Sequence, residues 1–377
     1  MEAIILAGGL GTRLSHIVKD VPKPMAPVAG RPFLEYILDY LIENDIKRVI
    51  LATGYKHEII EQHFGNLYKN IEIIYSVENE PLFTGGAIKK ALSKCKENNV
   101  FIINGDTYFN VDLKEMKKFH IESNSEITIA TKLMYDFERY GTVVLKQNRI
   151  IEFKEKQPMR KGLINGGIYI INRNIFQCIE KNKFSFEKDV MEKKTEEILI
   201  NSFESDGYFI DIGIEEDYYL AQDKFKKSKA LFLDRDGTIN VDTGHLYKTE
   251  DLVFIKGVPE FIKKYNQFGY KVIVITNQAG IAKGYYREQD MHKLHNYMNE
   301  KLKSEYGAQI DAFYFCPHHP DFTGECNCRK PKTGMLEQAI NDFNIDVSQS
   351  LLVGDKPWDI ECGKRIGIKS YYVEEFI

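Results

Sequence analysis

The sequence is poor in several features that would assign its class at once. Its 377 residues include only six cysteines, and its charges nearly cancel to a net −4. So few cysteines in a chain of this length exclude a disulfide scaffold. The small net charge gives no electrostatic case for binding nucleic acid or a membrane. No apolar run reaches the roughly 20 residues of a membrane-spanning helix, and neither a repeat nor a low-complexity tract is visible.

What is present is the composition of an ordinary globular protein. Hydrophobic residues make up 43% and charged residues 28% of the chain, and this length predicts about two to three domains. The chain enters an apolar stretch at residues 3–7 without the layout of a secretory signal, so we expect a cytoplasmic protein. Three cysteines fall within the thirteen residues 316–328, which favours metal binding in a reducing compartment.

The most informative stretch of the sequence is LFLDRDGTIN, residues 231–240. Four apolar residues, 230–233, run directly into Asp234, with Asp236 two positions later and a Gly-Thr pair at which the backbone can turn. At the end of an extended strand both carboxylates can approach one point. Their mutual repulsion there predicts a bound cation, and Mg²⁺ suits it.

A change of pattern marks a domain boundary just before this stretch. A helical pattern ends in a lysine-rich segment with almost no glycine or proline, and a strand-first pattern begins at Ala230. We expect two α/β domains in tandem, each a Rossmann-like three-layer α/β/α domain. Their expected bounds are residues 1–225 and 230–377, joined by a short linker at 226–229.

The opening EAIILAGGLGTRL predicts a strand followed by a glycine-rich turn. Such glycines let backbone N–H groups approach a phosphate, and Arg13 adds a permanent positive charge. The turn is not a Walker loop, because no Lys-Ser/Thr follows, and Leu14 stands where the dinucleotide fingerprint needs its third glycine. Taken alone, the motif is equally compatible with a plain strand-to-helix turn.

Together with VPKPMAPVAGRPFLEY, this turn resembles the signature of the sugar-1-phosphate nucleotidylyltransferases. The resemblance implies that Lys23 binds the triphosphate and that Arg13 and Lys23 are catalytic. The turn residues that it places at the nucleotide are Leu6, Ala7, Gly8, Gly9, Gly11, Thr12 and Arg13.

VENEPLFTGGA, residues 77–87, matches the base-reading loop of this family, which implies that Glu78 and Gly85 lie at the nucleotide. The family usually has a glycine where Phe83 stands. A carboxylate only accepts hydrogen bonds, and guanine offers two adjacent donors on its Watson–Crick edge, whereas uracil and thymine offer one. Glu78 therefore favours GTP, the alternative being a solvated loop residue.

The same resemblance implies metal ligands and a sugar site. NVFIINGD predicts a buried strand that ends in Asp106, and Asp106 and Asp211 are the implied Mg²⁺ ligands. The implied contacts of the sugar phosphate are Asp106, Glu155, Lys156, Asn165 and Gly166. An oxygen of the sugar 1-phosphate would attack the nucleotide's α-phosphate and release pyrophosphate. Positioning and charge neutralisation suffice for this step, without a nucleophilic side chain.

From Ala230 onward, the motifs resemble those of the haloacid dehalogenase phosphatases. The resemblance implies that Asp234 attacks a phosphomonoester and that Asp236 protonates the departing oxygen and then activates water. Thr276 would hold the phosphoryl group, and Lys330, with Arg329 beside it, would balance its charge. The implied Mg²⁺ ligands are Asp234, Asp355 and, through its carbonyl, Asp236.

FCPHHPDFTGECNCRKP, between two of these motifs, offers three thiolates and an imidazole in two short pairs. They are Cys316, His318, Cys326 and Cys328, which suit a closed, structural Zn²⁺ site. His319 could replace His318, and spare reduced thiols are the alternative. Such a site would brace the loop that leads into Lys330. On a charged helix nearby, His292 and His295 are predicted to be surface residues.

This loop, with DRDGTIN, TNQAGIAKGYY and CRKPKTGM, is similar to the phosphatases that remove the 7-phosphate of heptose 1,7-bisphosphate. Histidinol-phosphate phosphatases share it, but a sugar-1-phosphate transferase in the same chain has no use for histidinol. We expect a bifunctional enzyme that takes GTP and heptose phosphates, uses Mg²⁺ in both domains and Zn²⁺ in the second, and yields GDP-heptose. The alternatives are a mannose-like sugar beside a generic phosphatase, or a non-catalytic sensor. The sequence leaves a homo-oligomer open.

Overall fold

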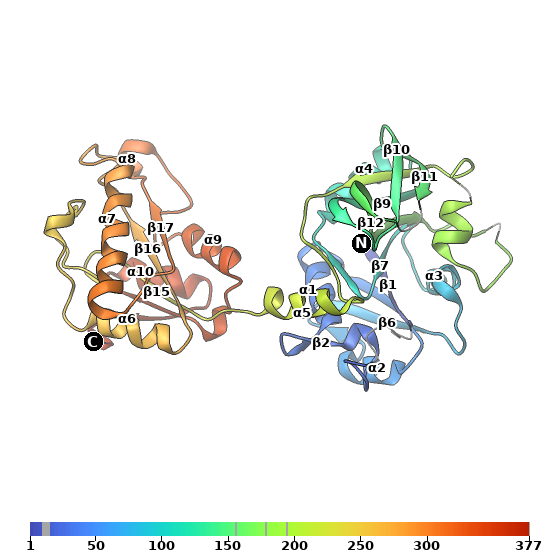
Figure 1. The fold of residues 1–377 in the computed structure, drawn as a ribbon, viewed down its shortest axis with the longest axis horizontal. Helices are drawn as coiled ribbons and strands as arrows, with labels where there is room; N and C mark the ends of the chain where they lie inside the picture. Colours follow the sequence, from blue (N-terminus) through green and yellow to red (C-terminus); the bar gives the residue numbers. More distant parts are fainter. Residues whose placement is uncertain (10–15, 155–156, 178, 194, 377) are drawn as a thin grey trace. The chain divides into compact units, whose positions relative to one another are not determined.

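The chain forms two compact units, Met1–Phe225 and Lys226–Ile377. The structure is a computed structural model that describes residues 1–9, 16–154, 157–177, 179–193 and 195–376 (Figure 1). Each unit has a sheet and a hydrophobic core of its own. None of the helices in the described part of the chain has the length and apolar character needed to cross a membrane.

The first unit is built on a ten-stranded sheet, counted over the described residues, in the order β10-β11-β13-β9-β12-β7-β1-β4-β6-β5. Its strands are β1 Glu2–Ala7, β4 Arg48–Thr53, β5 Leu67–Tyr68, β6 Ile71–Val77, β7 Asn99–Asn104, β9 Ile127–Phe137, β10 Thr142–Lys146, β11 Arg149–Lys154, β12 Met159–Asn172 and β13 Ile200–Glu204. The centre, β7-β1-β4-β6, is parallel, and β12 pairs with β7 antiparallel. Two small ribbons lie apart from it, formed by β2 Pro27–Val28 with β3 Arg31–Pro32 and by β8 Thr107–Phe109 with β14 Phe209–Asp211.

Helices cover both faces of this sheet. They are α1 Phe33–Glu43, α2 His57–Phe64, α3 Phe83–Leu92, α4 Leu113–Glu122 and α5 Glu215–Phe225. Alternate residues of β1 point to opposite faces: Ala3 and Ile5 pack with α1, α2, α4 and α5, whereas Ile4 packs with α3. The unit therefore has the predicted three-layer α/β/α arrangement.

The second unit contains a parallel sheet of five described strands in the order β17-β16-β15-β18-β19. The strands are β15 Ala230–Leu233, β16 Lys271–Asn277, β17 Ala312–Cys316, β18 Leu351–Gly354 and β19 Lys369–Tyr372. The helices are α6 Val258–Gln267, α7 Glu288–Lys301, α8 Pro320–Thr323, α9 Gly334–Phe343 and α10 Pro357–Arg365. Leu231 and Leu233 pack with α6 and α7, whereas Phe232 packs with α9 and α10. This unit is also a three-layer α/β/α domain, as predicted.

Candidate active sites

Three carboxylates meet at the carboxyl edge of the sheet in the second unit. Asp234 follows β15, Asp355 follows β18, and Asp359 lies in the first turn of α10. Because β15 and β18 are parallel neighbours, their ends bring the first two side chains together. One oxygen of each carboxylate lies within 4.8 Å of the others. Such an all-oxygen group suits Mg²⁺.

Lys330 lies among these carboxylates. Its Nζ is 2.8 Å from Asp234 Oδ1 and 2.6 Å from Asp359 Oδ1, and it donates to the Ile275 carbonyl at 2.8 Å. Asp359 was not among the residues predicted from the sequence. The available signal was its position four residues after Asp355, at the start of a helix, where Asp359 Oδ2 also accepts the Lys356 backbone N–H at 3.0 Å.

The electrostatics of Asp234 also fit a bound cation. Burial raises the pKa of Asp234 to about 7; Lys330 opposes the rise and the Asp359 charge adds to it. A nucleophilic carboxylate has to be ionised, which a divalent cation beside it would favour. Asp355 Oδ1 is buried and accepts no hydrogen bond from the described residues. Close packing surrounds it, since a Cβ on Gly237, which has a φ of +84°, would lie 2.3 Å from Asp355 Oδ2.

Asp236 accepts hydrogen bonds on both oxygens. Arg235 Nε and Asn240 Nδ2 each lie 3.0 Å from Oδ1, while Arg235 Nη2 at 2.8 Å and Gln278 Nε2 at 3.0 Å reach Oδ2. Burial alone would raise the pKa of Asp236, but Arg235 and the two amides lower it. Gln278 also donates to Thr276 Oγ1 at 2.8 Å. One amide therefore connects Thr276, which is expected to hold the phosphoryl group, with Asp236, which is expected to transfer the proton.

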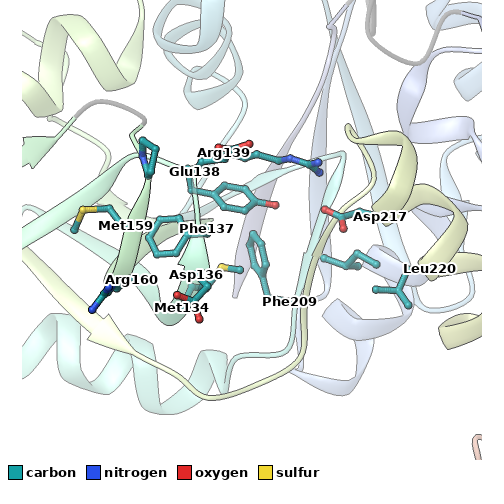
Figure 2. A pocket seen from close by; sticks show the side chains of 13 residues that line it. Met134, Asp136, Phe137, Glu138, Arg139, Met159, Arg160, Phe209, Asp217 and Leu220 are labelled. Atoms are coloured by element: carbon teal, nitrogen blue, oxygen red, sulfur yellow. The ribbon is translucent and has the colours of Figure 1, made fainter.

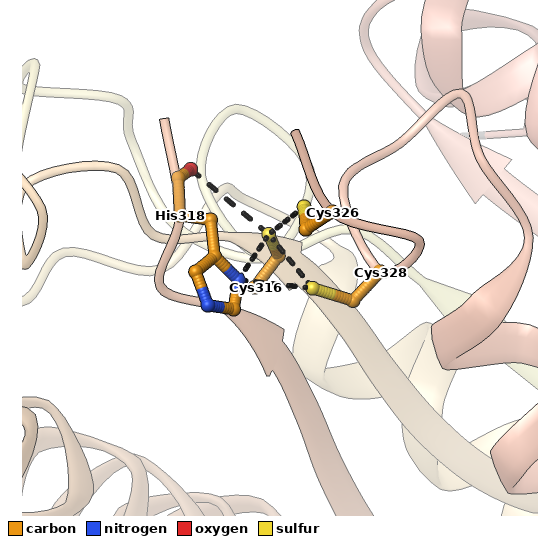
Figure 3. Close-up of side chains that lie close together, drawn as sticks. All are labelled: Cys316, His318, Cys326 and Cys328. Atoms are coloured by element: carbon orange, nitrogen blue, oxygen red, sulfur yellow. Dashed lines mark hydrogen bonds between the residues drawn. The ribbon is translucent and has the colours of Figure 1, made fainter. Parts of the chain in front are cut away.

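The cysteine-rich loop brings Cys316, His318, Cys326 and Cys328 together (Figure 3). Cys316 Sγ lies 3.6 Å from Cys326 Sγ and 3.1 Å from Cys328 Sγ, and His318 Nδ1 lies 3.3 Å from Cys328 Sγ. These separations approach the edges of a tetrahedron around Zn²⁺ with bonds of about 2.0–2.3 Å. Burial and the neighbouring Cys328 raise the pKa of Cys316, so its thiolate would need a cation.

The other histidine of this loop has a different position. His319 Nδ1 accepts the Asp321 backbone N–H at 3.3 Å and caps α8, so the structure places His318 and not His319 in the cluster. Arg329 donates from Nη1 to the His318 carbonyl at 3.1 Å. The loop thus connects the cluster to the segment that carries Lys330.

In the first unit, Lys23 contacts two carboxylates. Asp106 follows β7, and Asp211 lies opposite Thr107 because β14 pairs with β8. Lys23 Nζ contacts Asp106 Oδ2 and lies 3.7 Å from Asp211 Oδ1. Burial and the Asp106 charge raise the pKa of Asp211. Two carboxylates this close fit a shared cation such as Mg²⁺.

A cavity of about 850 Å³ opens beside Asp106. Of the predicted nucleotide contacts, those that line it are Leu6, Gly8, Gly9 and Glu78. Glu78 Oε2 accepts the Leu82 backbone N–H at 3.0 Å. Burial raises the pKa of Glu78, an effect that the Leu82 hydrogen bond opposes. Phe83 also lines the cavity.

The remaining predicted contacts of this unit lie in different surroundings. Ala7 is buried in the core, and Gly85 lies against Phe184; neither lines the cavity. Asn165 donates to the Tyr169 hydroxyl at 2.9 Å, and Gly166 packs against Phe109. The predicted residues that lie outside the described ones are Gly11, Thr12, Arg13, Glu155 and Lys156.

The structure also contains a cavity of about 740 Å³ that sequence reasoning missed (Figure 2). The end of β9 and the start of β12 form one wall, and β14 and α5 form the other. Tyr140 packs edge-on against Phe209 with ring centroids 5.6 Å apart, and burial and the Asp211 charge raise its pKa. Arg139, Arg160 and Asp217 add charged groups to the lining. The charged and aromatic run DFERY, residues 136–140, was the available signal.

The prediction that His295 is a surface residue is wrong. His295 is buried at 2% exposure, whereas His292, one turn earlier on α7, has a side chain that is 54% exposed. A charged helix still has an inner face, which Met291, Leu294 and Met298 mark in α7 by their helical spacing. His295 falls on that face, so the available signal was this spacing.

The fold and the two sites define a chain that combines a nucleotidyltransferase with a phosphatase. The chain belongs to the nucleotidyl transferase family, whose sequence pattern it matches over residues 2–228. Residues 229–361 match the family described as polynucleotide kinase 3 phosphatase.

Individual proteins with named reactions match each part of the chain over most of their own length. The chain is 56% identical, over 59% of its length and 97% of the relative, to the D-glycero-alpha-D-manno-heptose 1-phosphate guanylyltransferase of Aneurinibacillus thermoaerophilus. It is 46% identical, over 38% of its length and 80% of the relative, to the D-glycero-beta-D-manno-heptose-1,7-bisphosphate 7-phosphatase of Haemophilus ducreyi. HddC from Yersinia pseudotuberculosis, crystallised with GMP-PN, is 38% identical with a TM-score of 0.55, over 60% of this chain and 99% of that one. The chain is therefore a fusion of two heptose-phosphate enzyme homologues, as its motifs predicted.

Proposed function

We propose that this chain catalyses two consecutive reactions. The second unit would remove the 7-phosphate of heptose 1,7-bisphosphate, and the first would join the resulting heptose 1-phosphate to GMP from GTP, giving GDP-heptose and pyrophosphate. The observation that carries the proposal is the fusion itself. The phosphatase relative is named for a reaction that leaves a sugar 1-phosphate, and the transferase relative is named for consuming one.

In the phosphatase site, an Asp234 oxygen would attack phosphorus and form an aspartyl-phosphate as the bond to the sugar oxygen breaks. That oxygen keeps the electron pair and takes a proton from Asp236, which then removes a proton from the water that hydrolyses the aspartyl-phosphate. Because Arg235 lowers the pKa of Asp236 in the unliganded site, Asp236 would have to take up its proton when the phosphate dianion binds beside it. Lys330 and Thr276 would hold the phosphoryl oxygens. Mg²⁺, held by Asp234, Asp355, the Asp236 carbonyl and the newly identified Asp359, would supply charge neutralisation.

In the transferase site, the two substrates react with each other. The heptose 1-phosphate oxygen attacks the α-phosphorus of GTP, and the bond to pyrophosphate breaks. Lys23 would neutralise phosphate charge beside Asp106 and Asp211, which would hold Mg²⁺ as a further neutralising charge. Arg13 would add to this charge, and the sugar would be held by Glu155, Lys156, Asn165 and Gly166.

The two cavities of the first unit suggest where the nucleotide and the sugar bind. We assign the nucleotide to the larger cavity, where Glu78 Oε1 is available to accept from guanine while Oε2 is held by the loop backbone. We assign the sugar's distal hydroxyls to the cavity beside Tyr140. The Asp211 charge raises the pKa of Tyr140, so this cavity lies close to an expected Mg²⁺ ligand. Its arginine and carboxylate lining suits hydroxyl groups.

Zn²⁺ in the loop cluster would be structural, because three cysteines and one histidine complete a tetrahedron without a water. Reduced thiolates and a nucleoside triphosphate substrate both favour the cytoplasm. The linker at 226–229 stays a prediction, and a homo-oligomer stays open.

The deciding experiment is a one-pot assay of the full chain with Mg²⁺ and heptose 1,7-bisphosphate. Each of GTP, ATP, UTP and CTP is supplied in turn, and phosphate and pyrophosphate are followed together. Pyrophosphate that appears only with GTP, and only after phosphate, supports both activities, their order and the base. Phosphate without pyrophosphate for any nucleotide would contradict the transferase assignment.

The same assay should be run with both anomers. The transferase relative is named for the alpha anomer and the phosphatase relative for the beta anomer. Because the product of the second unit has to be a substrate of the first, we expect the alpha anomer to be hydrolysed at least as efficiently as the beta anomer. A phosphatase that accepts only the beta anomer would contradict the coupled reaction sequence.

A further inference from the structure

We infer that His295 is a positioning residue of the phosphatase site and acts on Asp236 through Arg235. The inference rests on the proposed phosphatase function. Arg235 stands between the two aspartates of the DRD motif and is completely buried. His295 comes from α7, sixty residues further along the chain.

All three guanidinium nitrogens of Arg235 are engaged. Nε and Nη2 donate to the two oxygens of Asp236 at 3.0 and 2.8 Å, and Nη2 also donates to the Leu246 carbonyl at 2.9 Å. Nη1 lies 3.1 Å from His295 Nε2. The planar fork that holds Asp236 is therefore anchored by His295 at Nη1 and by the Leu246 carbonyl at Nη2, and His295 is the anchor that a side-chain substitution can remove.

The chemistry of the pair defines the state of the imidazole. Arginine has only donors, so His295 Nε2 has to be the acceptor and the ring is neutral with its proton on Nδ1. Burial and the neighbouring Arg235 charge, with a smaller effect of His292, lower the pKa of His295 to about 3, although Asp236 opposes them. The neutral acceptor state agrees with the geometry.

Keeping a histidine here costs stability. Its Nδ1 is buried and has no hydrogen-bond partner among the described residues, a state that proteins generally avoid. The ring stacks on Phe313 with centroids 4.4 Å apart and an interplanar angle of 15°. A phenylalanine could stack in the same way without the unsatisfied N–H. What it could not do is accept the hydrogen bond from Arg235.

The consequence for the reaction depends on the leaving group. A sugar alkoxide leaves poorly unless it is protonated as the phosphorus–oxygen bond breaks, which is the proposed task of Asp236. p-Nitrophenolate leaves readily without a proton. Loosening Asp236 should therefore impair hydrolysis of the sugar phosphate much more than hydrolysis of p-nitrophenyl phosphate.

The test compares His295→Phe, His295→Gln and the matched control His292→Phe in the full chain. The readout is kcat/KM for heptose 1,7-bisphosphate divided by kcat/KM for p-nitrophenyl phosphate, because kcat/KM reports the steps up to departure of the leaving group. We expect this ratio to fall about 10- to 100-fold in His295→Phe. In His295→Gln, whose amide oxygen can accept from Arg235, it should stay within about 3-fold of the unsubstituted value, as it should in His292→Phe.

Equal losses on both substrates in a folded His295→Phe protein, or no loss, would overturn the inference. Folding is checked by thermal melting and by pyrophosphate formation at the first unit. If His295→Phe does not fold, His295→Gln and His295→Asn decide, since only the longer amide is expected to keep the ratio. Failure of the unsubstituted chain on both phosphatase substrates would instead reject the proposed function.

Discussion

The two active-site edges differ in how deeply their charged groups are buried. In the phosphatase site, Lys330 is 1% exposed and its partner Asp234 10%. In the transferase site, the matching pair, Lys23 and Asp106, is 16% and 35% exposed. Both sites place a lysine beside a carboxylate that follows a parallel strand, Asp234 after β15 and Asp106 after β7, so the difference in burial does not come from the strand arrangement.

The difference follows from the chemistry that each site would perform. A carboxylate that forms a covalent bond to phosphorus has to be held in one position with its charge compensated, which burial among Lys330 and Asp359 achieves. Two substrates that react with each other need a site open enough to admit both. Burial is therefore concentrated where the chain supplies the nucleophile.

The largest effect is expected from removing that nucleophile. Asp234→Asn should lower phosphatase activity by at least about 10³-fold, because the amide cannot attack phosphorus. Nucleotide transfer, measured with heptose 1-phosphate and GTP, should be unchanged. Loss of both activities in a folded variant would break the comparison, since the two sites would then not be independent.

The counterpart in the open site is Lys23→Met. Loss of one phosphate-neutralising charge should reduce pyrophosphate formation by about 10²- to 10³-fold, with phosphate release from heptose 1,7-bisphosphate unaffected. Lys19→Met, an exposed lysine nearby, is the control. If Lys23→Met lowers pyrophosphate formation no more than the control does, Lys23 serves only to offset the repulsion between Asp106 and Asp211.

A smaller effect, on stability, is expected at the cysteine cluster. Cys326→Ser should remove bound zinc and lower the melting temperature of the second unit by about 5 °C or more, because metal binding and folding are coupled. The loop also carries Lys330, so phosphatase activity should fall with zinc content. Cys362→Ala, outside the cluster, should keep its zinc. Full zinc content in Cys326→Ser, measured by metal analysis, would refute the ligand assignment.

The sequence was informative where function is local and less so where it depends on tertiary packing. Asp234 was predicted from the apolar run that precedes it, and Asp355 from the resemblance of its motif to the haloacid dehalogenase phosphatases; both follow strands, and parallel strands bring their ends together. Asp359 and His295 were not predicted, because the roles that we propose for them depend on contacts with distant segments. The helical spacing of Met291, Leu294 and Met298 does place His295, and not His292, on the inner face of α7, but it gives no sign of the Arg235 contact.

The smallest predicted effect concerns the strained residue of the open site. Phe83 has a φ of +59°, a conformation that costs a residue with a side chain about 1–2 kcal/mol and that glycine adopts freely. The residue is 60% exposed and lines the cavity that we assign to the nucleotide. Because a costly backbone conformation is kept at a residue that lines this cavity, we predict that the Phe83 ring contacts the nucleotide.

Phe83→Gly should therefore change stability and affinity in opposite directions. Release of the strain should leave the unliganded unit as stable or up to about 1 kcal/mol more stable, because the greater freedom of glycine in the unfolded chain offsets part of the gain. Loss of the ring should raise the Kd for GTP about 3- to 10-fold. Phe83→Ala, which keeps the strain and lacks the ring, should lose affinity without gaining stability. If affinity is unchanged in both variants, the ring does not contact the nucleotide, and the strain at the transferase site has no function comparable to the buried charges of the phosphatase site.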